Sequence, residues 1–206
     1  MTCSDITWIL DNGHGGMLGA SYQTKGKRSP EVKPGLGVYE GEFNRSIVKR
    51  VMAESVHEGI QCFDLVPEDM NVPLKIRLAR VSSIKKTYGK CALISVHANA
   101  AGKGWNKANG FVIFHEKSGY WCFESQRLAN IASGSAHIFL PEKMSRSRGI
   151  KQANFAMIAK PAMPSILLEC GFMTNKSDCE LLITEDYRAA VARVILETIM
   201  DFTYAL

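Results

Sequence analysis

Two histidines and two glutamates of this sequence each lie in a short, distinctive segment. The segments are Asp11-Asn12-Gly13-His14-Gly15-Gly16, Glu40 just before a helical pattern, Ser95-Val96-His97-Ala98-Asn99-Ala100, and Leu168-Glu169-Cys170-Gly171-Phe172. Two imidazoles and one carboxylate fill three corners of a tetrahedral zinc site and leave the fourth corner to water. The remaining carboxylate is then free to accept a proton from that water. Together these side chains are the inventory of a zinc hydrolase.

The elements that would position them are short apolar strands alternating with helices. Apolar runs predict strands at 6–10, 60–66, 91–96, 110–114 and 166–168. Helical spacing predicts four helices: from Phe43 to Gly59, from Pro73 to Gly89, over 122–132, and a C-terminal helix that Thr184 caps. The apolar positions of the second helix are Ile76, Leu78, Ala79 and Val81. Residues 17–39, 101–109 and 141–150 read as loops, and 155–159 as a short extended piece. The alternation predicts an α/β fold in one domain, 1–206, with an open, mixed but mostly parallel sheet and helices on both faces.

Three of the candidate side chains fall at equivalent places on that frame. His14, His97 and Glu169 each follow the end of a predicted apolar strand. In open α/β sheets the ligand crevice lies outside the carboxyl ends of the strands. We therefore expect these side chains to meet at one rim, although they are remote in sequence. Glu169 is the sharpest case, because a charge at the edge of a core is costly without a partner.

Composition and charge narrow the classes of function. With 46% hydrophobic residues the chain can bury a core, and a net charge of +5 suits a protein that approaches an acidic surface such as a cell wall. No nucleic-acid-binding motif accompanies this basicity, so no nucleic-acid partner is expected. No apolar stretch approaches the ~18 residues that span a bilayer, so no stable membrane insertion is expected. Residues 1–5 show no secretory signal, and the six cysteines lack Cys-x-x-Cys spacing, which favours reduced thiols in a protein made in the cytoplasm.

The segments, in this order, resemble the zinc-dependent N-acetylmuramoyl-L-alanine amidases of the family often called amidase 3. That family has Asp-Pro-Gly-His-Gly-Gly where this chain has 11–16, and Glu-Lys-Asp-x-Asn-Leu where this chain has 40–45. Its Ser-x-His-x-Asn-Ala and Glu-x-Gly-Phe-x-x-Asn segments match 95–100 and 169–175, and its Arg-Gly-Val-Lys-Gln-Ala segment matches 148–153. The resemblance spans roughly residues 6–204.

The resemblance implies the roles of the candidate residues. His14, Glu40 and His97 would hold one Zn²⁺ per chain, and Glu169 would be the catalytic base. The bond cut would be the amide between the lactyl group of N-acetylmuramic acid and the L-alanine of the peptidoglycan stem peptide. Glu169 would take the proton of the attacking water and pass it to the leaving amine.

Two departures from the family pattern leave details open. Glu42 lies two residues after Glu40, so either could be the ligand; Asn44 favours Glu40 because it fixes the register. Glu42 would then be a first-turn acid facing the helix dipole. Asn12 replaces the family's proline, which we expect to alter the rigidity of the turn more than metal binding.

Further polar residues are weaker candidates. Asp11 and Asn99 could orient ligands through hydrogen bonds, although ordinary turn chemistry explains both equally well. The resemblance implies that Arg148 and Lys151 face the substrate, where they could pair with carboxylates of the stem peptide. It also makes Asn99 a candidate for contact with the substrate. A solvated basic loop explains Arg148 and Lys151 equally well, and only the resemblance favours a contact with the substrate.

Other functions remain open from the sequence. The same zinc site would serve a peptidase that cuts within the stem peptide, and a catalytically inactive wall-binding module would share the fold. Cys170 as a nucleophile is a third reading, but nothing in its flanks indicates a lowered pKa. The expected setting is the cell wall, reached by phage-type release or by export along another route. The stem-peptide chemotype, the host and the oligomeric state stay undetermined.

Overall fold

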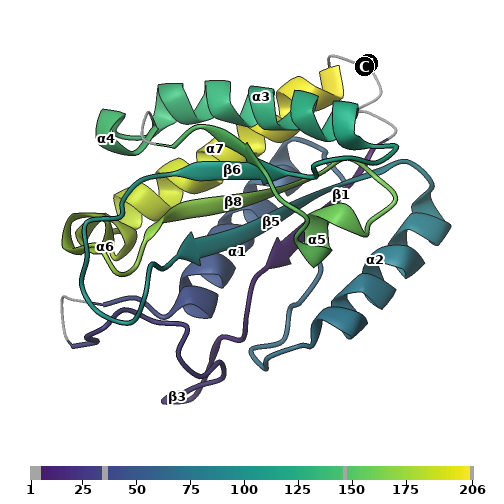
Figure 1. Cartoon of the computed structure of the whole chain (residues 1–206). Coiled ribbons are helices and arrows are strands. Elements are labelled where there is room, and N and C mark those ends of the chain that lie inside the picture. The colour runs from purple at the N-terminus through teal and green to yellow at the C-terminus, as the bar shows by residue number, and fades with distance from the viewer. Residues whose placement is uncertain (1–5, 34–36, 146–147, 205–206) are drawn as a thin grey trace.

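The computed structural model describes residues 6–33, 37–145 and 148–204, and a six-stranded sheet lies at its centre (Figure 1). The strands, in the spatial order β4-β1-β5-β8-β6-β7, are β4 (Cys62–Asp64), β1 (Thr7–Asn12), β5 (Cys91–Asn99), β8 (Ser165–Phe172), β6 (Val112–His115) and β7 (Ile150–Gln152). The first four run parallel, and β6 and β7 run antiparallel to them. A two-stranded ribbon, β2 (Met17–Leu18) with β3 (Ser21–Tyr22), follows β1.

Helices cover both faces of the sheet. One face carries α1 (Glu40–His57), α3 (Cys122–Phe139) and α7 (Glu185–Tyr204), which pack on one another and on the sheet. The other face carries α2 (Leu74–Tyr88) and the short α5 (Ala156–Ala159), visible in front of the sheet in Figure 1. The short α4 (Glu142–Ser145) packs against α3, and α6 (Lys176–Leu182) packs against β8 and α7. The predicted α/β class, with a mostly parallel sheet covered on both faces, is confirmed.

The two faces are covered unequally, and the site lies on the thinly covered one. Ile9 of β1 and Leu93 of β5 belong to the smaller core under α2 and α5. Side chains alternate along a strand, so Asp11, two residues after Ile9, and His97, four after Leu93, project to that same side. Glu169 lies opposite His97 in the pairing of β8 with β5. The alternation therefore brings these polar groups to one face, just beyond the cover of α2 and α5.

The strands that carry the site are longer than the apolar pattern predicts. His97 and Glu169 lie inside β5 and β8, not after them, because backbone pairing continues through the polar residues to Asn99 and Phe172. A ladder of backbone hydrogen bonds needs no apolar side chains, so hydrophobicity alone ends these strands too early. The expected meeting of the carboxyl ends of parallel strands nonetheless holds.

Some helices differ from their prediction as well. Residues 155–159, expected to be extended, form α5, and the expected loop 141–150 contains α4 and the start of β7. Single helical turns are too short to show a period, which is why the sequence missed them. In α2 the buried residues are Arg77 and Val81, whereas Ile76 and Ala79 are exposed. The C-terminal helix begins as predicted, with the Thr184 hydroxyl accepting the Tyr187 N–H.

Two expectations concern export and membranes. Residues 1–5, which include Cys3, lie outside the described residues, and so does the expectation that they carry no secretory signal. Across the described part of the chain, no helix is long and apolar enough to cross a bilayer. The described cysteines Cys62, Cys91, Cys122, Cys170 and Cys179 are free thiols.

Candidate metal centre

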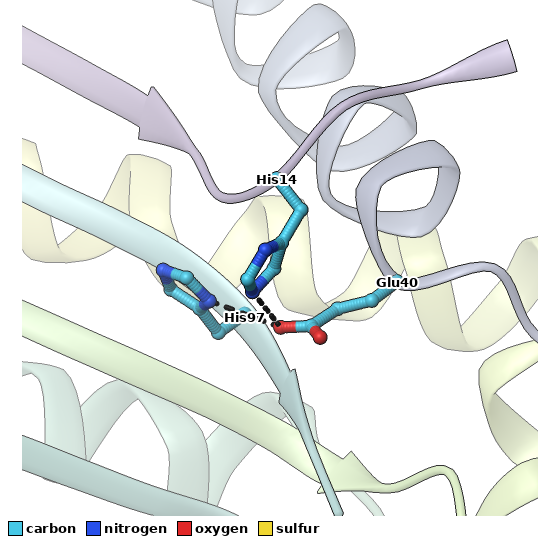
Figure 2. Close-up of side chains that lie close together, drawn as sticks. All are labelled: His14, Glu40 and His97. Atoms are coloured by element: carbon cyan, nitrogen blue, oxygen red, sulfur yellow. Dashed lines mark hydrogen bonds and ion pairs between the residues drawn. The ribbon is translucent and has the colours of Figure 1, made fainter. Parts of the chain in front are cut away.

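His14, Glu40 and His97 converge from three different elements onto one point (Figure 2). A single oxygen of Glu40, Oε1, lies 3.2 Å from His14 Nε2 and 3.0 Å from His97 Nδ1. The two imidazole rings meet edge to face, with centroids 5.2 Å apart. Figure 2 shows both rings directed at the carboxylate, His14 from the loop after β1 and His97 from β5. Glu40 is the first residue of α1 and is almost fully buried.

His14 is held in an unusual backbone conformation. Its φ is +65°, and it is the one non-glycine residue with positive φ among those described. Such a conformation costs about 1–3 kcal/mol unless neighbours impose it. Here Arg45 Nη1 and Arg77 Nη2 both donate to the His14 carbonyl oxygen, at 2.9 and 2.8 Å. Two buried guanidinium groups thus fix the turn that aims the imidazole.

Arg77 links this turn to the end of β1. Its guanidinium also donates to the carbonyl oxygen of Asn12 and pairs with the Asp11 carboxylate, which additionally accepts the Ser95 hydroxyl at 2.6 Å. Asp11 and Arg77 are both buried. Asp11, considered above as an orienting group, thus acts on the site through Arg77 and the turn.

Glycines allow the loop after β1 and helix α1 to approach closely. A Cβ on Gly13 would lie 2.2 Å from the His97 ring, and a Cβ on Gly41 would lie 1.9 Å from the Gly15 carbonyl oxygen. Asn44 Nδ2 donates to the Gly13 carbonyl oxygen at 2.9 Å. The segment 40–45 therefore supplies one candidate ligand, one close approach and two donors, from Asn44 and Arg45, that hold the opposite loop.

The electrostatics of the triad favour a charged carboxylate between two imidazoles. Burial alone would raise the pKa of Glu40, but its hydrogen bonds to His14 and His97 outweigh burial and lower this pKa to about 2. Burial alone would lower the pKa of His97, but the hydrogen bond and charge of Glu40, with the charge of Glu169, raise it. The cluster is thus built around one fixed negative charge.

Glu169 lines the same cleft, and one of its two carboxylate oxygens lacks a hydrogen-bond partner. Its Oε2 is buried and accepts no hydrogen bond within the described structure. Burial raises the pKa of this carboxyl to about 7. The negative charge of Glu40 adds to this rise, whereas the positive charges of His97 and Lys27 oppose it. A half-buried carboxyl in a cleft, with one buried oxygen unpaired, is costly for folding and typical of a functional site.

The three converging side chains fit a zinc ion. Nitrogen and oxygen atoms about 2.0–2.1 Å from a tetrahedral zinc lie about 3.3 Å from one another. The separations of 3.2 and 3.0 Å seen here are close to that edge length, and the three donor atoms all lie within 4.8 Å of one another. Glu169 lines the same cleft, where a proton acceptor for a water would be needed.

The structure separates Glu40 from its sequence alternative. Glu42 makes a two-pronged ion pair with Arg188 of α7, at 2.6 and 2.9 Å, and is not part of the triad. Asn12, in place of the family's proline, is fully buried and donates to Asp64 Oδ1 at 2.8 Å and to the Val66 carbonyl oxygen at 3.1 Å. Its amide thus ties the end of β1 to β4 through hydrogen bonds.

The remaining candidates lie in different places. Asn99 lines the cleft, and its Oδ1 accepts the backbone N–H of Ala100. Arg148 and Lys151 are exposed and do not line the cleft; the Arg148 guanidinium lies over the Phe172 ring at 5.1 Å. Cys170 is fully buried, and burial raises the pKa of its thiol well above the ordinary value. A thiol held protonated in the core is a poor nucleophile.

Sequence reasoning missed the residues that hold the site together. Arg45 and Arg77 are buried arginines inside helices, and apolar periodicity gives no sign of them. Gly41 and Asn44 did carry a signal, because the segment Glu40-Gly41-Glu42-Phe43-Asn44-Arg45 combines a small residue with two donors at the start of a helix. This pattern matches the family motif, but it does not predict which residues Gly41 and Asn44 contact.

Comparison with known proteins adds independent findings. The uncharacterized protein YqiI of Bacillus subtilis is 26% identical over 196 residues, which cover 95% of this chain and 84% of that protein. The N-acetylmuramoyl-L-alanine amidase LytC of Bacillus subtilis is 30% identical over 161 residues, 78% of this chain and 30% of LytC. The solved N-acetylmuramoyl-L-alanine amidase AmiC2 of Nostoc punctiforme has a TM-score of 0.73 and 26% identity, covering 98% of both chains. The family model described as N-acetylmuramoyl-L-alanine amidase matches residues 9–201, and the chain therefore belongs to the Amidase_3 family.

Proposed function

We propose that the chain hydrolyses the amide between the lactyl group of N-acetylmuramic acid and L-alanine in peptidoglycan, using one zinc ion. Membership of the amidase family supports the reaction class. The observation that carries the proposal is the convergence of His14, Glu40 and His97 in a cleft that Glu169, with one unpaired carboxylate oxygen, also lines. The enzyme would act at the cell wall, where peptidoglycan is found.

The cleft has the size and lining that such a substrate needs. It measures about 490 Å³ and contains all three candidate ligands together with Glu169. Val72, Pro73 and Leu74, which lead into α2, supply an apolar wall, and Phe155 and Met157 at α5 continue it. A concave site with an apolar wall and a few convergent polar groups is the usual form of a small-substrate site.

The side chains divide the chemical work. His14, Glu40 and His97 would hold the zinc ion, which when bound acidifies a water molecule and polarises a carbonyl. Glu169 accepts the proton of the attacking water and then delivers it to the amide nitrogen as the C–N bond breaks. In the metal-free protein burial raises the pKa of this carboxyl to about 7, and the charge of a bound zinc ion would lower it, which keeps the carboxylate available as a base at neutral pH.

Analysis of the products tests the reaction. Purified peptidoglycan is incubated with zinc-loaded protein, with chelated protein and with chelated protein after zinc is returned. An amidase releases intact stem peptides with a new N-terminal alanine, identified by mass spectrometry. Fragments cut within the stem would establish a zinc peptidase instead, and absence of any cleavage would leave a wall-binding module.

Variants test the roles of the residues. Glu169→Gln should retain one zinc per chain and lose turnover by about 10²–10⁴-fold, the usual contribution of a general base. His14→Ala should lose the zinc itself. Glu42→Gln is the matched control, because Glu42 pairs with Arg188 on the far side of α1's first turn. Near-normal turnover of Glu169→Gln would refute the assignment of the base.

A further inference from the structure

One cation that lines the cleft has no hydrogen-bond or ion-pair partner among the described residues. The charged side chains that line the cleft are Asp11, Lys27, Glu40, Arg77 and Glu169. Asp11 and Arg77 neutralise each other, and Glu40 lies between the two histidines. Lys27 is exposed and makes no hydrogen bond or ion pair through its ammonium group with any described residue. Lys27 nonetheless lines the same cleft as Glu169.

A backbone hydrogen bond ties Lys27 to Glu40, one of the three candidate metal ligands. The Lys27 carbonyl oxygen accepts the N–H of Glu40 at 3.0 Å. The next residue, Arg28, forms a β-bridge with Tyr39, and the Ser29 N–H donates to the Val38 carbonyl oxygen at 2.9 Å. The loop that carries Lys27 is therefore tied to the first residue of α1, so its side chain starts from a fixed point at the rim. A positioned cation loses less entropy on binding a ligand than one on a free loop.

The cleft is therefore asymmetric. Leu74 and Phe155, both partly exposed, lie on the apolar wall at α2 and α5. Lys27 comes from the loop before α1 and supplies the one positive charge of the lining that is not already paired. A ligand that fits both sides carries an apolar or sugar portion and a negative charge. Arg148 and Lys151, the cations that the sequence suggested for this purpose, do not line the cleft.

We propose that Lys27 recognises a carboxylate of the stem peptide next to the L-alanine whose amide is cut. This inference rests on the proposed amidase function and adds a specificity-determining residue to it. The lysine ammonium is a compact point charge that binds a carboxylate more strongly than the oxygen of a neutral carboxamide at the same position. The protein would accordingly prefer stem peptides in which that carboxylate is free over those in which it is amidated.

The test compares two ligands and two variants. The ligands are synthetic N-acetylmuramoyl-L-alanyl peptides that carry either a carboxylate or a carboxamide at the same position of the residue after L-alanine. The variants are Lys27→Gln and, as a matched control, Lys25→Gln, which removes an equal charge from the same loop outside the cleft lining. Zinc content and melting temperature verify that both variants are folded and loaded.

The expected result is a difference confined to one ligand. Lys27→Gln should raise KM for the carboxylate peptide roughly tenfold, as expected for losing a hydrogen bond to a charged group. It should change KM for the carboxamide peptide by less than about twofold, while Lys25→Gln changes neither and Lys27→Arg retains most of the preference. An equal loss for both peptides would overturn the inference, because Lys27 would then act through Glu169 or the fold.

Binding separates this inference from the proposed function. The dissociation constants of both peptides are measured by calorimetry on zinc-loaded protein carrying Glu169→Gln, with and without Lys27→Gln. If the wild type cleaves neither peptide, the proposed function fails, yet a carboxylate preference that depends on Lys27 still supports the inference. Equal dissociation constants for the two peptides would refute it whatever the activity.

Discussion

Replacing Glu169 by glutamine should make the metal-free protein more stable at neutral pH while it destroys activity. The side chain is half-buried, and its buried Oε2 accepts no hydrogen bond from the described residues. Burial raises its pKa in the folded chain to about 7, from an ordinary value of 4.5. The folded state therefore binds the proton more tightly than the unfolded state. The stability that this carboxyl contributes is complete below pH 4.5 and is lost as the pH rises through 7.

The size of the effect follows from these two pKa values. Each pKa unit corresponds to about 1.4 kcal/mol, so the interval from 4.5 to about 7 corresponds to ~3 kcal/mol at pH 8. At pH 5 the same reasoning leaves a difference below about 1 kcal/mol. Glutamine has the shape of the protonated carboxyl and does not ionise. Glu169→Gln should accordingly gain up to ~3 kcal/mol over the wild type at pH 8 and little at pH 5.

Urea denaturation of chelated protein between pH 4.5 and 8.5 measures this difference directly. Glu40→Gln is the control of opposite sign: its pKa of about 2 lies below the ordinary value of 4.5, so the carboxylate contributes stability above pH 4.5 and this variant should be less stable than the wild type throughout the measured range. If Glu169→Gln were no more stable than the wild type at pH 8, or if its advantage were the same at pH 5, the reasoning from a buried, unpaired carboxyl would be wrong.

The remaining predictions concern the frame of the site and its metal. Gly41→Ala places a Cβ 1.9 Å from the Gly15 carbonyl oxygen and should weaken zinc binding at least tenfold in a chelator competition assay, whereas Gly134→Ala, with open space around its Cβ, should leave zinc binding unchanged. Arg77→Met leaves the buried Asp11 carboxylate without its cation and should cost about 3–5 kcal/mol of unfolding free energy; adding Asp11→Asn should recover part of it, and strictly additive losses would contradict the pairing. Zinc at 100 times its dissociation constant should stabilise the wild type by about 2.7 kcal/mol in thermal denaturation, and His14→Ala should show no such gain.

The sequence by itself determined the class of fold and singled out the candidate reactive side chains. Apolar runs alternating with helical spacing are local signals, and they were enough to predict a mostly parallel sheet with helices on both faces. Short polar segments around His14, His97 and Glu169 marked functional residues because glycines, small neighbours or a charge beside a core are unusual in ordinary packing.

Only the tertiary structure decided how these residues meet. Arg45 and Arg77 reach the carbonyl oxygen of His14 across 31 and 63 residues of sequence, and the Glu42 carboxylate is directed to Arg188, 146 residues away. Such contacts depend on how whole helices and strands pack against one another. A periodic sequence pattern predicts which face of an element is apolar, but it does not predict which polar group from a distant part of the chain will contact that element. The same holds for Lys27, an ordinary loop lysine in the sequence, which the packing of its loop against α1 brings to the rim of the cleft.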